Sequence, residues 1–320
     1  MEKKYIFIEH YQNENNLPAI RKIYEMPEEE FIKILPANET VFKVYRFEEL
    51  LATLIDNFLE FNNVILSYAD KARVQSLFKE NYFQKRIDIN RTALNFFASL
   101  NMYRDFVKTH INDTYITNFL DTSSAFQCCL IMRNYIQHVD FFPIISNVSY
   151  TSCDIDVMLA SVRFQIDAAD LKVDKLHKAT NEKFYKYFLP GEKIDLYQIV
   201  NQGMDEILLI QSKIRNLPLY TVDYAESKVL LLDIEQKISR KNSSIVGLPH
   251  YFESDGNPND LKTCFVATDT IKFIDENIKR FPCNRSSSNQ YVTTAPKEFV
   301  DKCNSEIFVP AFNRRISKTN

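Results

Sequence analysis

The sequence predicts a mainly α-helical protein, with a helical bundle in its first half and additional α/β segments in the C-terminal half. Apolar residues recur at helical spacing from Phe47 onward, and such a stripe marks the buried face of a helix. The chain of 320 residues holds only four glycines, which disfavours a turn-rich sandwich or barrel. Apolar and other side chains alternate over residues 158–166, which indicates a strand in the C-terminal half.

Changes in pattern along the chain divide it into four predicted segments. They are an N-terminal arm over 1–45, a helical bundle over 46–142, a strand hairpin with long helices over 143–242, and an irregular extension over 243–320. In the arm, Pro27 and the acidic residues after it predict a short helix over 26–35. Pro18, Pro27 and Pro36 are expected to break the arm into short units.

The bundle is predicted from the apolar stripes and helix-end signals of its helices. The first stripe runs from Phe47 to Leu59, and a second helix is expected over about 90–110, capped by Asp88 or Asn90. The core face predicted for this second helix consists of Ala93, Phe97, Leu100, Tyr103 and Val107. A further helix over 124–138 is expected to begin with a capping box of Ser124 and Gln127 and to end before Pro143.

The C-terminal half is predicted to mix strands with long helices. Residues 145–151 are the expected hairpin partner of the strand at 158–166. Further helices are expected over 168–188, 194–214 and 222–240, short strands over 245–252 and 264–270, and a loop over 285–290.

Charge and cysteine content limit the functional classes. The net charge of −3 and pI near 6.0 do not suit a general nucleic-acid binder, although an RNA-cutting enzyme needs only a local positive site. None of the six cysteines forms a CxxC pair or a zinc-like spacing, so we expect reduced thiols in a cytoplasmic protein, without metal or cofactor. The sequence contains no stretch long and apolar enough to predict a membrane span.

The candidate site lies late in the helix predicted over 124–138. Arg133 can bind a phosphate through two N–H groups of its planar guanidinium. His138 can exchange a proton near neutral pH, and the Asn134 amide offers both a hydrogen-bond donor and an acceptor. At about 100° per residue, Asn134 and His138 share one helix face and Arg133 flanks it. One helix cannot surround a phosphate with these groups, so the layout predicts a composite site in a homodimer.

The run CysCysLeuIleMetArgAsnTyrIleGlnHis (128–138), with Pro143 shortly after it, resembles the Arg-Asn-x-x-x-His signature of HEPN domains. These are small helical modules, many of them metal-independent ribonucleases of toxin–antitoxin and anti-phage systems. The resemblance implies that Arg133 and His138 are catalytic, that Asn134 lies beside them, and that RNA is the substrate. The resemblance also implies that a regulatory partner protein is possible. Some relatives carry a modifiable tyrosine two places after the histidine, where this chain has Asp140, so we do not predict that form of control.

Two other polar groups could support the site. Arg104 and Asp105, near the end of the helix predicted over 90–110, either assist the motif from a neighbouring helix or form a surface ion pair. Residues 71–91 combine cations with aromatic side chains such as Phe78 and Phe83, a mixture that either contacts RNA or forms a solvated helix face.

The alternative to a ribonuclease is a non-catalytic HEPN-like module that binds protein or RNA. A catalytic helix should present all three motif side chains to a dimer cleft, whereas a scaffold should bury them in hydrogen bonds or leave them on an open face. A hydrolase with Cys129 as nucleophile has weak support, because nine residues separate it from His138.

Overall fold

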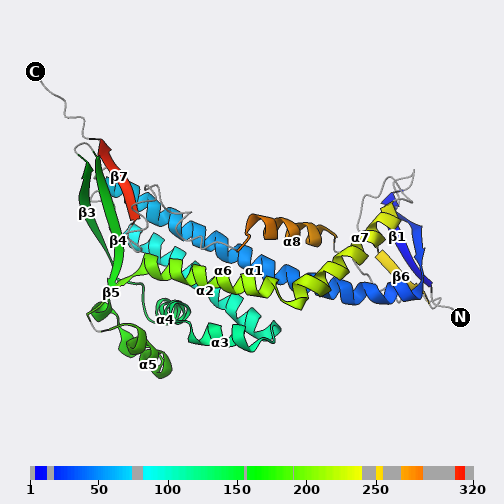
Figure 1. The fold of residues 1–320 in the computed structure, drawn as a ribbon, viewed down its shortest axis with the longest axis horizontal. Helices are drawn as coiled ribbons and strands as arrows, with labels where there is room; N and C mark the ends of the chain where they lie inside the picture. Colours follow the sequence, from blue (N-terminus) through cyan, green and yellow to red (C-terminus); the bar gives the residue numbers. More distant parts are fainter. Residues whose placement is uncertain are drawn as a thin grey trace, which may run out of the picture. The chain divides into compact units, whose positions relative to one another are not determined.

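The computed structural model describes residues 4–12, 18–73, 82–154, 157–189, 191–239, 250–254, 268–283 and 307–313. The chain divides into two compact units, each built from two stretches of sequence. The first unit comprises Met1–Glu49 and Lys213–Pro282, and the second comprises Leu50–Ser212 and Cys283–Asn320. Figure 1 shows that the described residues are mostly helical, which confirms the predicted mainly α class.

The first unit combines a small antiparallel sheet with helices. The strands β1 (Lys4–Gln12), β2 (Pro18–Met26) and β6 (His250–Ser254) lie in the order β2-β1-β6. The helical elements are the first part of α1 (Glu28–Arg73), a π-helix (Leu219–Tyr224), α7 (Ala225–Ser239) and α8 (Thr268–Arg280).

A buried carboxylate organises the helices of the first unit. Glu48 on α1 is fully buried, and its oxygens accept hydrogen bonds from Arg215 at 2.6 and 2.9 Å, Tyr220 at 3.0 Å and Asn277 at 2.8 Å. A buried charge is tolerated when it is paired and its lone pairs are satisfied, so this network specifies how these segments meet.

The described part of the second unit is mainly helical. Its helices are the remainder of α1, α2 (Tyr82–His110), α3 (Thr114–Thr122), α4 (Ser124–His138), α5 (Lys178–Tyr187) and α6 (Leu196–Arg215), which ends in the first unit. The five residues predicted as the core face of the second helix are all fully buried on α2. Phe96 of α2 packs against Phe58 of α1 with ring centroids 6.1 Å apart, and the buried Tyr103 hydroxyl donates to Gln211 of α6 at 2.5 Å.

The second unit also holds the predicted hairpin. Strands β3 (Ile144–Asp154) and β4 (Val157–Asp167) pair antiparallel with Val148 opposite Val162, which confirms the strand and its partner. The other edge of β4 pairs with β5 (Lys193–Asp195) and β7 (Ile307–Asn313), seen as the red strand in Figure 1.

Two helix boundaries differ from prediction because long-range packing overrides local signals. α1 is continuous through Pro36, where a break was expected, and residues on both sides of Pro36, such as Ile34 and Ala37, are buried. α2 begins at Tyr82, so Asp88 and Asn90 lie inside it and are not its caps. Asp88 instead accepts a hydrogen bond from Tyr68 of α1 at 2.8 Å.

The C-terminal half contains further corrections. Residues 168–188 form two short 3₁₀ turns before α5 rather than one long helix, and α8 begins at Thr268 where a strand was expected. The long helix near 194–214 is confirmed as α6, and the helix near 222–240 as α7 preceded by the π-helix. The loop predicted at 285–290, Phe78, and most of the extension 243–320 lie outside the described residues.

Candidate functional site

The helix that carries the motif, α4, is fixed at its N-terminus by side chains from two elements. Its N-cap is Ser123, one residue before the predicted cap, and the Ser123 hydroxyl accepts from the Phe126 N–H at 3.1 Å. Glu206 of α6 accepts from the same N–H at 3.2 Å and from the Ser123 hydroxyl. A carboxylate at a helix N-terminus is electrostatically favourable, although burial raises the pKa of Glu206.

Close packing against α6 fixes the middle of α4. Cys129 is fully buried, and its thiol donates to the Ile199 carbonyl at 3.5 Å. Gly203 of α6 leaves room for this sulfur, because a Cβ atom at position 203 would lie 2.5 Å from Cys129 Sγ. The two helices therefore approach as closely as they do only because residue 203 has no side chain.

The turn after α4 is tied to the start of α2. Asn90, which is fully buried, accepts from the Phe142 N–H at 2.7 Å and donates to the Phe142 carbonyl at 3.2 Å. Arg86 donates to the carbonyls of Phe141 at 2.8 Å and Phe142 at 2.9 Å. These bonds fix where α4 ends and thus where His138 lies.

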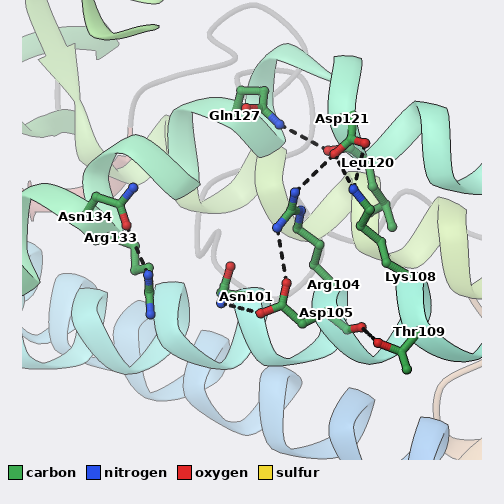
Figure 2. Close-up of polar contacts among 10 residues, drawn as sticks. All are labelled: Asn101, Arg104, Asp105, Lys108, Thr109, Leu120, Asp121, Gln127, Arg133 and Asn134. Atoms are coloured by element: carbon green, nitrogen blue, oxygen red, sulfur yellow. Dashed lines mark hydrogen bonds and ion pairs between the residues drawn. The ribbon is translucent and has the colours of Figure 1, made fainter. Parts of the chain in front are cut away.

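The three motif residues do not converge within one chain. Arg133 and Asn134 are half-buried, and the Arg133 guanidinium donates from Nη1 to Asn134 Oδ1 at 3.0 Å, as Figure 2 shows. The buried Nε of Arg133 has no hydrogen-bond partner. His138 is exposed in the last turn of α4, with no hydrogen bond or ion pair to the described residues. The helix thus offers an exposed imidazole and, about one turn away, a guanidinium–amide pair.

A second set of charges lies just beyond His138. Lys172 donates from Nζ to Asp140 Oδ2 at 2.6 Å, and its backbone N–H donates to the hydroxyl of the buried Tyr135 at 3.3 Å. The hydrogen bond from Lys172 lowers the pKa of the Asp140 carboxyl, and the same bond raises the pKa of Lys172. The residue two positions after His138 is therefore an ion-paired carboxylate.

Arg104 and Asp105 belong to a separate ionic cluster that joins α2 to α3. Asp121 of α3 pairs with Arg104 at 3.1 Å and with Lys108 at 2.7 Å, and Arg104 also contacts Asp105 at 3.2 Å. Figure 2 places this cluster apart from Arg133, with no interaction joining them. Two cations and two carboxylates compensate each other here, so the surface ion-pair interpretation of Arg104 and Asp105 fits this arrangement.

The cysteines beside the motif are poor nucleophiles. Burial raises the pKa of Cys128 to about 12 and raises that of Cys129 well above its usual value. A thiol attacks as its thiolate, which neither residue forms near neutral pH. Within the described part of the chain, no three His, Cys, Asp or Glu side chains gather to form a metal site. No described helix is long and apolar enough to cross a membrane.

Three residues that shape this site were not found from the sequence. Glu206 caps the motif helix from about 80 positions later in the chain, Lys172 reaches it from the segment after β4, and Asn90 was predicted as a cap of its own helix. Each acts through tertiary contacts, which leave no local pattern in the sequence.

A scan of protein-family models, a search of curated proteins and a search of solved structures each find no match to this chain.

Proposed function

We propose that the protein is a metal-independent endoribonuclease whose site is built from Arg133, Asn134 and His138. The observation that carries this proposal is the end of α4, where an exposed histidine follows a preoriented arginine–asparagine pair by about one helical turn. An exposed imidazole is accessible to a ribose hydroxyl, and a guanidinium provides charge for a phosphate. The HEPN resemblance of residues 128–138 supports the same assignment, together with a role as a toxin or anti-phage effector.

The proposed chemistry needs only these side chains, the RNA and water. His138 accepts the proton of a ribose 2′-hydroxyl, and the oxygen attacks the adjacent phosphorus while the bond to the 5′-oxygen of the next nucleotide breaks. Water protonates the departing 5′-oxygen, and His138 then returns its proton to the solvent. Arg133 stabilises the charge that develops on the phosphate oxygens. Asn134 orients the Arg133 guanidinium through their hydrogen bond. The products carry a 2′,3′-cyclic phosphate and a 5′-hydroxyl, and DNA resists because it lacks the attacking hydroxyl.

The geometry of α4 favours a site made by two copies. Arg133 and His138 are five residues apart, so they project about 140° apart around the helix axis. A second copy related by a two-fold axis would place its own Arg133 and His138 opposite those of the first, because a symmetric interface brings identical patches together.

The first experiment compares growth and RNA integrity in cells that express the wild type or the Arg133→Ala/His138→Ala double variant at matched soluble levels. The proposal predicts growth arrest and RNA fragmentation with the wild type alone. His110→Ala is a matched control, because His110 also ends a helix and is exposed but stacks on Phe106 with ring centroids 4.1 Å apart. Equal toxicity of wild type and double variant would contradict the assignment.

The second candidate function is a non-catalytic module that binds RNA or protein. The observation that favours it is the Arg133 side chain, which is half-buried and bonded to its own neighbour. Purified protein separates the candidates. A scaffold retains its dimer and its RNA affinity but leaves RNA intact, whereas the ribonuclease loses cleavage and keeps its dimer in the His138→Ala variant.

A further inference from the structure

One face beyond the end of the motif helix combines an exposed aromatic ring with cations. Phe141 is 41% exposed although it is large and apolar. Arg86 donates to the Phe141 backbone carbonyl at 2.8 Å, and both Lys172 and Arg86 interact with Asp140, the residue that precedes Phe141, at 2.6 and 4.0 Å. We call Arg86, Asp140, Phe141 and Lys172 the Phe141 surface. Its aromatic residue is three positions from His138.

Hydrogen bonds hold the backbone and the charged groups of the Phe141 surface in place. Arg86 binds the backbone carbonyl of Phe141, and the Phe141 N–H donates to Asp140 Oδ1 at 2.8 Å. Lys172 is fixed at two points, its backbone on the Tyr135 hydroxyl and its ammonium on Asp140. A backbone and a cation that are already held in position lose little conformational freedom when a ligand binds.

The charges of this surface suit an anion. Arg86 and Lys172 carry one positive charge each and Asp140 one negative charge, so the surface is left with one net positive charge in a chain whose formal net charge is −3. Half of the Lys172 side chain is exposed, with a relative accessibility of 51%. An aromatic face beside a cation binds a nucleobase by stacking and its phosphate by charge.

We propose that the Phe141 surface is a nucleotide subsite, in which Phe141 stacks on an unpaired base and Lys172 binds the adjacent phosphate. This inference rests on the proposed ribonuclease function, since it assigns the subsite to the nucleotide next to the one cut at His138. Asp140 acts against binding, because it holds the Lys172 ammonium and repels the phosphate.

The proposal predicts affinity changes of opposite sign from the two partners of one ion pair. The probe is a fluorescein-labelled oligonucleotide with 2′-O-methyl groups, which the proposed chemistry cannot cleave, and binding to the full chain is followed by anisotropy. Lys172→Ala is expected to weaken binding, and Asp140→Asn to strengthen it by roughly two- to fivefold. Loss of a structural ion pair would move both variants in the same direction.

Phe141→Ala tests the stacking contact. The loss of one base–aromatic stack weakens binding by roughly five- to a hundredfold. Phe141→Tyr is expected to restore it, because the ring is kept. The exposed side chain at this position makes both variants compatible with folding.

A second ion pair of the same unit serves as the charge-matched control. Lys108 Nζ and Asp121 Oδ2 are 2.7 Å apart, and both side chains are partly exposed. Lys108 lies 22 residues after Arg86 on α2, about 33 Å along the helix axis. Lys108→Ala and Asp121→Asn change the net charge equally, and they are expected to leave affinity nearly unchanged. Lys172→Ala alone should reduce the slope of log affinity against log salt concentration by about 0.7, the value for one single-strand phosphate contact.

The outcomes separate this inference from the proposed function. Loss of binding in Phe141→Ala and Lys172→Ala supports the subsite even if the wild type proves unable to cut RNA. Wild-type cleavage that depends on His138, with unchanged affinity in both subsite variants, overturns the subsite and leaves the ribonuclease standing. A change of oligomeric state in Phe141→Ala at unchanged RNA affinity also overturns it, because the ring would then cover a protein partner.

Discussion

The packing of the motif helix against α6 can be tested at a single pair of atoms. An alanine Cβ at position 203 would lie 2.5 Å from Cys129 Sγ, closer than the two atoms can approach, so one helix must shift. Overpacking of this kind costs about 1–3 kcal/mol. Alanine in place of a helical glycine returns about 1 kcal/mol of backbone entropy. The net expectation for Gly203→Ala is a loss of about 0–2 kcal/mol in the free energy of unfolding.

The effect of Gly203→Ala on the free energy of unfolding should change sign when the sulfur of Cys129 is removed. In a Cys129→Ala background the next neighbours of the new Cβ are Leu100 Cδ1 at 3.5 Å and Phe96 Cζ at 3.7 Å, which are ordinary contacts. Gly203→Ala is then expected to stabilise that background by up to about 1 kcal/mol, because only the entropy term remains.

The assay is chemical denaturation of the wild type, the two single variants and the double variant, followed by far-ultraviolet circular dichroism because the chain has no tryptophan. The double-mutant cycle isolates the contact between the two positions. If Gly203→Ala has the same effect in both backgrounds, Cys129 and Gly203 do not touch, and the described seating of α4 on α6 is wrong.

Three further outcomes are expected. Asn90→Ala should lower the free energy of unfolding by about 1–3 kcal/mol, because it removes the acceptor of the buried Phe142 N–H; an unchanged denaturation midpoint would refute this. Burial raises the pKa of Asp195 to about 6 from 3.8, so this carboxyl ionises first in the unfolded chain as pH rises, and its contribution to stability should fall between about pH 4 and 6. Asp195→Asn should remove that fall, which is at most about 3 kcal/mol, in denaturation series across pH. Cys128→Ser should leave RNA cleavage unchanged in a gel assay, because this thiol stays protonated.

Features with a local signal were predictable from the sequence. The core face of α2 follows from five apolar residues at helical spacing, all of which are fully buried. The β3–β4 hairpin follows from alternation along the chain, a pattern that neighbouring side chains set by themselves. The helical state of residues 124–138 and the placement of Arg133, Asn134 and His138 near its end follow for the same reason.

Features made by distant residues were not predictable. Ser124 and Gln127 satisfy the capping-box pattern, yet the cap is Ser123 because its hydroxyl also meets Glu206 of α6. Gln127 instead donates to the Leu120 carbonyl at 3.2 Å. The continuity of α1 through Pro36 likewise depends on tertiary burial, which outweighs the local cost of one missing hydrogen bond.

The partners of Arg104 illustrate the same limit at the candidate site. Arg104 and Asp105 are adjacent in sequence, but Asp121 decides their role because it binds Arg104 and Lys108 together. A polar residue near a motif in sequence can therefore belong to a different cluster in the fold. Conversely, Lys172 lies 34 positions after His138 in the sequence. In the fold it contacts Asp140, which follows His138 by two positions.

The most direct test of the proposed function is cleavage of short RNAs by purified protein in EDTA, with the ends of the products identified. The proposed mechanism predicts fragments with a 2′,3′-cyclic phosphate and a 5′-hydroxyl, no cleavage at a position with a 2′-deoxy nucleotide, and no cleavage by Arg133→Ala or His138→Ala. Wild-type protein that leaves every RNA intact, or a His138→Ala variant that cuts equally well, would contradict it.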